Sequence, residues 1–240
     1  MGISGQRILI TGGSSGIGFA VARALALVEG AKVTIASRST DKLRAARAAL
    51  DNKVEARELD VTDESAIIRF FSDFGPFDHL VTAASTAAMG PAVDMPTAAF
   101  RALVDSKLYG QFLVARHAAG HIAAHGSITF FSGTVTQKPI LGATAYAAVG
   151  AAAEAMARML AFELAPRRVN TVVPGVIDTP AWDSLFDANT KSAVFSQIAS
   201  SLPVRRLGTP DDIAQAVLFL ISNGFVDGAS LVVDGGHRLI

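Results

Sequence analysis

Short apolar runs alternate with longer segments of helical period along this chain. The runs are RILIT (7–11), KVTIAS (32–37), VEAREL (54–59), HLVTA (79–83), SITFF (127–131), RVNTVV (168–173) and SLVVD (230–234). Several are continuously apolar instead of alternating, as expected of strands that are covered on both faces of a parallel sheet. Alternating strands and helices predict βαβ units with right-handed crossovers, and therefore a doubly wound α/β sheet.

One section interrupts this alternation, at about residues 179–202. It shows weak helical signals and no strand, and it carries the apolar residues Trp182, Leu185, Phe186, Phe195 and Ile198. Long excursions after the carboxyl end of a strand often cover a ligand in such folds. We therefore expect a lid over a substrate here; the alternative is a solvated surface insertion.

Composition indicates one compact domain over residues 1–240. Half of the 240 residues are hydrophobic and 18% are charged, so the chain can bury a large core. The formal net charge is zero, with 21 basic and 21 acidic side chains in no long block of one sign, which argues against a nucleic-acid partner. A small-molecule ligand is the better expectation.

The absence of cysteine and the N-terminal sequence limit the possible chemistry and the cellular location of the protein. The chain has no cysteine, which excludes disulfides, thiolate nucleophiles and cysteine-based metal sites. The N-terminal residues lack the regions of a signal peptide, and no apolar run reaches the roughly 18 residues that span a bilayer. We expect a cytoplasmic protein without a membrane partner.

A glycine-rich turn, TGGSSGIG, follows the first predicted strand and opens the first predicted helix. Glycine lets the backbone turn sharply and approach a phosphate, and the N–H groups at a helix N-terminus stabilise negative charge. Tight turns also need glycine for steric reasons alone, but the position between strand and helix favours pyrophosphate binding. The predicted cofactor-binding residues of this turn are Gly12, Ser14, Ser15, Gly16, Ile17 and Gly18.

The ends of the second and third predicted strands indicate which dinucleotide binds. An acidic residue at the second strand end would bind the free ribose hydroxyl of NAD, whereas an arginine accommodates the extra phosphate of NADP. The chain has Ser37 and Arg38 there and no acid, which favours NADP(H) over NAD. Asp60, followed by Val61, ends the third strand and would suit the exocyclic amine of the adenine.

The chain resembles the short-chain dehydrogenase/reductase family over nearly its whole length. The resemblance rests on TGGSSGIG, LDVTD, ELAPRRVNTVVPGVIDTP, RRLGTPDDIAQAVLFLIS and GASLVVDGG in combination. It implies a Rossmann-type fold with a seven-stranded parallel sheet, a nicotinamide cofactor and a homo-oligomer, a dimer or a tetramer. It also places at the cofactor Ala83, in a turn LVTAAS where NNAG is usual, and the carboxamide-binding residues Pro174, Gly175, Val176 and Thr179.

The implied catalytic set is a serine, a tyrosine acid/base, a lysine four residues later and an asparagine from an earlier helix. Tyr146 matches the tyrosine, but Gly150 stands in the place of the lysine and Lys107 in that of the asparagine. The usual serine spacing falls on Gly133, so a shift of one residue is needed for a hydroxyl to serve. We favour Ser132 over Thr134 for this role; the alternative is that Ser132 only caps the strand end.

A tyrosine needs a nearby cation to act as a base at neutral pH, because its unperturbed pKa is near 10. Our hypothesis is that Lys107 and Gly150 form a compensating exchange, in which the long lysine stem brings the cation from a different helix into the space that Gly150 leaves. The alternative is that Lys107 is a surface lysine on a helix and that Gly150 marks a decayed site. The sequence then predicts an NADP(H)-dependent oxidoreductase of a small, partly apolar secondary alcohol or ketone. The alternatives are a catalytically silent NADP(H) sensor or scaffold, and a reaction without net cofactor oxidation.

No metal site is expected. His117, His121 and His125 recur every four residues and would form a stripe on one helix. The surrounding sequence supplies neither an acidic partner nor a fourth ligand for zinc, so we interpret the three residues as a polar or interface stripe.

Overall fold

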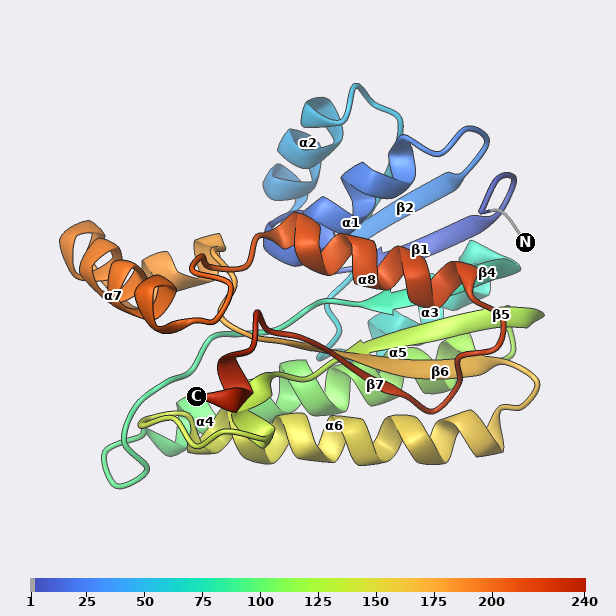
Figure 1. Cartoon of the computed structure of the whole chain (residues 1–240). Helices are drawn as coiled ribbons and strands as arrows, with labels where there is room; N and C mark the ends of the chain where they lie inside the picture. Colours follow the sequence, from blue (N-terminus) through green and yellow to red (C-terminus); the bar gives the residue numbers. More distant parts are fainter. Residues whose placement is uncertain (1–2) are drawn as a thin grey trace.

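The computed structural model describes residues 3–240, which form one seven-stranded parallel sheet with helices on both faces (Figure 1). The sheet order is β3-β2-β1-β4-β5-β6-β7. The strands are β1 (Arg7–Thr11), β2 (Lys32–Ser37), β3 (Glu55–Glu58), β4 (Phe77–Thr82), β5 (Ile122–Phe131), β6 (Arg168–Pro174) and β7 (Ser230–Val233). Each predicted strand is present, and the doubly wound parallel sheet is confirmed.

Two layers of helices cover the sheet, and each layer has its own apolar core. On one face lie α1 (Gly16–Ala26), α2 (Thr40–Ala49) and α8 (Pro210–Ser222); on the other lie α3 (Glu64–Phe74), α5 (Gly110–Ala118) and α6 (Thr144–Glu163). The central strands are buried on both faces: Ile8, Leu9 and Ile10 of β1 have no exposed surface. This accounts for their continuously apolar sequence.

The remaining helices lie at the end of the molecule where the site is found (Figure 1). α4 (Thr97–Leu103) continues into a π-helical segment, η1 (Val104–Tyr109), before α5 begins. A 3₁₀ turn, η3 (Pro180–Ser184), and α7 (Ala188–Ser201) occupy the section that interrupted the sequence pattern. Two further 3₁₀ turns are η2 (Thr134–Thr136) and η4 (His237–Leu239).

The order of the strands reverses at β1, which pairs with β2 on one side and with β4 on the other. In open parallel sheets, ligands bind in the crevice outside the carboxyl ends of the strands at such a reversal. The glycine-rich turn follows β1, and residues 83–88 follow β4, so both border this crevice.

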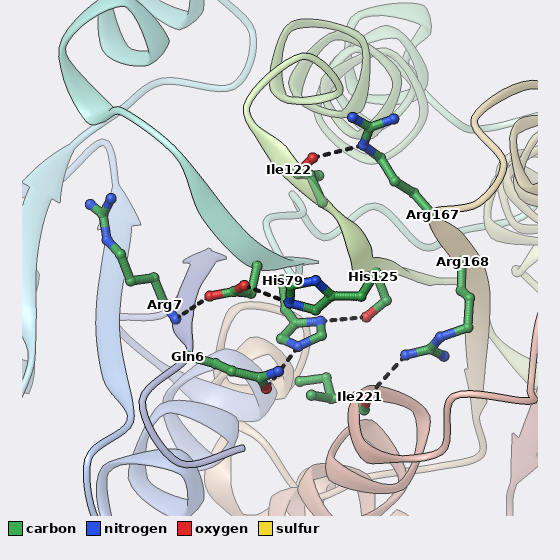
Figure 2. Close-up of polar contacts among 10 residues, drawn as sticks. Gln6, Arg7, His79, Ile122, His125, Arg167, Arg168 and Ile221 are labelled. Carbon is green, nitrogen blue, oxygen red and sulfur yellow. Dashed lines mark hydrogen bonds and ion pairs between the residues drawn. The ribbon is translucent and has the colours of Figure 1, made fainter. Parts of the chain in front are cut away.

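A buried polar cluster occupies the opposite region, toward the amino ends of the strands (Figure 2). In β4, His79 contacts Ser127 Oγ through Nδ1 (2.8 Å) and Gln6 Oε1 through Nε2 (3.0 Å). Burial lowers the pKa of His79 to about 4. Nearby, Asp78 accepts a hydrogen bond from the backbone N–H of Arg7 and contacts the ring of His125.

The predicted helical stripe of histidines is wrong. α5 ends at Ala118, His121 lies in the turn after it, and His125 belongs to β5. The side chain of His117 contacts Glu64, 2.8 Å away, and that of His125 contacts Asp78. The four-residue recurrence is therefore interrupted by a turn, which residues 119–121 form before the strand begins.

Across residues 3–240, no group of three or more His, Asp or Glu side chains is arranged to hold a metal ion. In the same part of the chain, no helix combines the length and the apolar character needed to cross a membrane.

Candidate active site

The glycine-rich turn packs directly against the backbone that follows β4. Gly12 has φ +74°, and a Cβ atom built on it would lie 2.5 Å from the Ala84 nitrogen and 2.6 Å from the Ala83 carbonyl carbon. Only glycine fits this approach and this backbone conformation. Ser15 precedes α1, and its side chain makes no capping hydrogen bond to the first turn. This arrangement suits a phosphate at the N-terminus of α1.

The segment after β6 lies across from the same turn. Its backbone is tied to β7 through Gly175 N and Val233 O (2.9 Å), and a Cβ on Gly175 would lie 2.7 Å from Asp234 Cα. Further along, the Cβ of Thr179 lies 3.6 Å from where a Cβ of Gly16 would be. A residue predicted to bind the pyrophosphate and one predicted to bind the nicotinamide carboxamide are therefore brought together. Of the other residues predicted here, Pro174 is the last residue of β6 and Val176 belongs to the segment.

The residues predicted for the adenosine end lie at the carboxyl ends of β2 and β3. Arg38 is exposed directly after β2. Asp60 accepts hydrogen bonds from the backbone N–H (2.9 Å) and the hydroxyl (2.7 Å) of Thr62, which orients its carboxylate. Val61 is buried and packs closely against Gly110, where a Cβ would lie 2.8 Å from Val61 Cγ2.

Lys107 is buried beside Tyr146. The residue belongs to the π-helical segment η1 and is 8% exposed. Its Nζ donates a hydrogen bond to the Ser132 carbonyl oxygen (3.3 Å). Nζ also lies 6.0 Å from the centre of the Tyr146 ring. Burial lowers the pKa of Lys107 to about 8, because it disfavours the charged form.

Tyr146, two residues into α6, directs its hydroxyl toward the segment after β4. The hydroxyl donates to the Thr86 carbonyl oxygen (3.2 Å) and accepts from the Ala88 N–H (3.4 Å). Burial raises the pKa of Tyr146 above its usual value, while the bond from Ala88 opposes that shift. The environment of this tyrosine therefore favours the protonated phenol until a cation stabilises the phenolate.

Gln111 holds the η1 segment against β5 from inside the structure. Its Nε2 donates to the Lys107 and Phe131 carbonyl oxygens, and its Oε1 accepts from Thr82 Oγ1 (2.8 Å) and the Phe131 N–H (2.9 Å). The residue is 2% exposed. These bonds hold the backbone of Lys107 next to the carboxyl end of β5, which Ser132 directly follows. π-helical turns occur frequently at functional sites.

Ser132 directs its hydroxyl away from Lys107 and toward α6. Oγ donates to Glu154 Oε1 at 2.7 Å, and Thr136 Oγ1 donates to the same oxygen at 2.9 Å. A Cβ on Gly150 would meet Ser132 Oγ at 2.8 Å and Thr136 Cγ2 at 2.9 Å. The prediction that Lys107 enters the space left by Gly150 is therefore wrong, because the Ser132 and Thr136 side chains fill that space. Lys107 instead reaches the carbonyl oxygen of Ser132.

Comparisons with known proteins point to one family. A family model described as enoyl-(acyl carrier protein) reductase matches residues 12–238. Short-chain dehydrogenase/reductase ATR9 of Stachybotrys chlorohalonatus is 34% identical over 99% of this chain and 98% of its own length. Cis-4-hydroxycyclohexanecarboxylate dehydrogenase of Sinomonas cyclohexanicum is 36% identical over 97% and 96%.

The chain belongs to the short-chain dehydrogenase/reductase family. A crystal structure of a small-chain dehydrogenase in complex with NADPH superimposes with a TM-score of 0.85, at 34% identity, over 98% of this chain and 99% of that one. Membership in this family makes the protein an oxidoreductase of alcohol and carbonyl groups.

In this short-chain dehydrogenase/reductase, sequence reasoning missed Gln111 and Glu154. A signal existed for Glu154, because Tyr146, Gly150 and Glu154 follow one another at four-residue steps and so share one face of α6. No comparable signal existed for Gln111, since its partners Thr82 and Phe131 come from two other strands.

Proposed function

We propose that the protein is an NADP(H)-dependent oxidoreductase that moves hydride between nicotinamide and a small, partly apolar secondary alcohol or ketone. Tyr146 is the acid/base, and Lys107 provides the cation that the family resemblance leads one to seek at Gly150. The observation that carries this proposal is the buried ammonium of Lys107, 6.0 Å from the Tyr146 ring.

The cofactor fits the residues that border the crevice. The close backbone approach at Gly12, which a Cβ would obstruct, suits a dinucleotide pyrophosphate at the N-terminus of α1. Exposed Arg38 suits the ribose phosphate that distinguishes NADP from NAD, and the related structure containing NADPH supports the same choice. When bound, the nicotinamide supplies or accepts the hydride.

The side chains of the protein carry out the proton transfer. During reduction the Tyr146 hydroxyl donates its proton to the carbonyl oxygen, and during oxidation the phenolate accepts it back. Burial raises the pKa of Tyr146, so the phenolate requires a neighbouring positive charge, and the Lys107 ammonium, 6.0 Å from the ring centre, is our candidate for it.

Ser132 is the proposed hydrogen-bond donor to the substrate oxygen. Its hydroxyl carries one proton, and that proton is directed to Glu154. Donation to a substrate therefore requires the Ser132 hydroxyl to rotate from this carboxylate during turnover, while the backbone N–H and carbonyl oxygen of Ser132 keep their own partners.

Residues 179–202 are the proposed lid. The rings of Trp182 and Phe186 stack at 6.0 Å between centroids, and Phe195 meets Trp182 edge-on at 5.5 Å. Lys191 joins α7 to the segment after β6 through Asp178 (3.3 Å) and to η3 through Asp183 (2.8 Å). An apolar surface held next to Thr179 by ion pairs suits the covering of a partly apolar substrate.

A homo-oligomer, a dimer or a tetramer, remains part of the proposal. α6 exposes a row of small and apolar side chains, ending in Met159 and Phe162, which are 58% and 83% exposed. Spacing of three and four residues places the row on one helix face, and small residues permit close approach of a second copy. The molar mass in solution, measured by light scattering, decides between a monomer and an oligomer.

The test is turnover of a carbonyl panel by the wild-type protein and by Lys107→Ala. NADPH and, separately, NADH are mixed with ketones, aldehydes and diketones, and absorbance at 340 nm is followed. We expect NADPH to be consumed by the wild type and the rate to fall by about a hundredfold or more in Lys107→Ala, since a cation beside the acid/base is lost. Lys53→Ala, which removes an exposed lysine, is the matched control.

Three outcomes would contradict the proposal. Wild-type rates in Lys107→Ala would show that the acid/base works without this cation. Binding of NADPH without turnover of any carbonyl would favour the silent sensor or scaffold instead. Product formed without net NADPH oxidation would indicate a different reaction at the same site.

A further inference from the structure

Glu154 is a buried carboxylate at the candidate site, and the proposed reaction assigns it no role. The residue is 9% exposed, and its Oε1 accepts hydrogen bonds from the hydroxyls of Ser132 (2.7 Å) and Thr136 (2.9 Å). A buried carboxylate is costly unless such bonds satisfy it, and hydrogen bonds to a charged acceptor are among the stronger ones. The carboxylate therefore holds both hydroxyls firmly.

Gly150 makes these bonds sterically possible. It lies one helical turn before Glu154 on α6, and a Cβ there would be only 2.8 Å from Ser132 Oγ and 2.9 Å from Thr136 Cγ2. Real Cβ contacts are longer than this, so any side chain at position 150 would displace one or both residues. The glycine and the carboxylate thus act on the same pair of side chains.

Ser132 connects this arrangement to the proposed active-site cation. Its backbone N–H donates to Val172 O (3.0 Å), and its carbonyl oxygen accepts from Lys107 Nζ (3.3 Å). The hydroxyl, the N–H and the carbonyl oxygen of one residue therefore bind α6, β6 and η1. A shift of Ser132 would move the acceptor that holds the ammonium.

We infer that Glu154 is a positioning residue: through its bonds to Ser132 and Thr136 it holds residues 132–136 in place, and through the Ser132 carbonyl oxygen it holds Lys107 beside Tyr146. The relevance of this positioning to catalysis rests on the proposed function. The inference also gives Gly150 a role of its own, because it leaves the room in which the two hydroxyls reach Glu154.

The experiment compares Glu154→Leu, which removes the acceptor, with Glu154→Gln, which retains an oxygen acceptor at the same length. Glu163→Leu, at the exposed end of the same helix, is the matched control. We measure kcat and the KM values for NADPH and for the carbonyl compound separately. Hydrogen–deuterium exchange of residues 132–137, with and without NADPH, gives a readout that does not depend on turnover.

We expect Glu154→Leu to lower kcat about tenfold or more while the KM for NADPH changes less than about twofold, since a misplaced cation affects the transition state more than cofactor binding. Glu154→Gln should recover most of kcat. Exchange of residues 132–137 should become faster in Glu154→Leu and remain as in the wild type in Glu163→Leu. Because Gly150→Ala displaces the same two side chains, combining it with Glu154→Leu should cost less than the sum of the two effects.

Unchanged exchange and unchanged kcat in Glu154→Leu would overturn the inference. An equal loss of kcat in the Gln and Leu variants would also overturn it, because charge and not positioning would then matter. If the wild type reduces no carbonyl, the proposed function fails, and the exchange data alone decide whether Glu154 holds residues 132–136.

Discussion

Burial shifts the pKa values of Tyr146 and Lys107 at the candidate site in opposite directions. It raises the pKa of Tyr146, so that the phenol keeps its proton, and it lowers the pKa of Lys107 to about 8, so that the ammonium is only just retained at neutral pH. A tyrosine acid/base and a cation of this kind would operate over a narrow range of pH. Burial of Lys107 at the site therefore also limits the pH range over which its side chain is charged.

This balance predicts how the rate depends on pH. Reduction should decline as the pH rises through about 8, because Lys107 loses its proton there, well below the pH at which Tyr146 would ionise. In Lys107→Arg, whose guanidinium stays protonated throughout the pH range measured, the residual activity should show no decline near pH 8. The check is kcat/KM for NADPH-dependent reduction between pH 6 and 10; an identical alkaline limb in both proteins would contradict the assignment.

At the scale of elements, the site depends on how η1 and α6 are held around the end of β5. η1 carries Lys107, α6 carries Tyr146 and Glu154, and Ser132 directly after β5 bonds to both Lys107 and Glu154. Gln111 fixes η1 to the strand through Phe131, with both the N–H and the carbonyl oxygen of that residue bound. The π-helical turn at Lys107 is wider than an α-helical turn, and the Gln111 bonds attach this wider turn to the end of β5.

Gln111→Leu should therefore destabilise the protein by about 2–4 kcal/mol, because the buried N–H of Phe131 and neighbouring polar groups lose their partner. The free energy of unfolding, measured with urea, checks this value. Gln137→Leu changes the same residue type at an exposed position and should cost less than about 0.5 kcal/mol. A loss in Gln111→Leu no larger than that control would show that the attachment contributes little.

At the scale of the whole molecule, the two ends of the sheet differ in their polar groups. The carboxyl ends of the strands border the candidate site, whereas the amino ends hold the cluster around His79 (Figure 2). His79 is neutral in the fold because burial lowers its pKa from 6.5 to about 4. Its protonation must therefore favour the unfolded chain.

This shift predicts acid sensitivity over a defined range. The contribution of His79 is fully present above pH 6.5, is lost progressively as the pH falls from about 6.5 to about 4, and amounts to about 3 kcal/mol. Urea unfolding at pH 7, 6, 5 and 4 should show this loss in the wild type. His79→Asn cannot titrate, so although it is less stable at pH 7, its stability should depend less steeply on pH over the same interval. Equal slopes would exclude His79 as the cause.

The sequence by itself determined the order of strands and helices, the glycine-rich turn and the candidate tyrosine. These features are local: an apolar run such as residues 7–11 is a buried strand wherever the sheet places it, and Gly12 is required by its own backbone conformation. The four-residue spacing of the histidines led to a wrong prediction of a helical stripe, because the spacing continues across the turn that separates α5 from β5.

Only the tertiary structure decided which side chains meet. It brought Lys107 of η1 beside Tyr146 of α6, directed the Ser132 hydroxyl to Glu154, and filled the space beside Gly150 with Ser132 and Thr136. Each of these contacts joins residues more than ten positions apart, and their directions depend on strand ends and helix rotation that no local pattern contains. The physical reason is that side-chain periodicity specifies the face of an element, whereas packing between elements specifies what that face contacts.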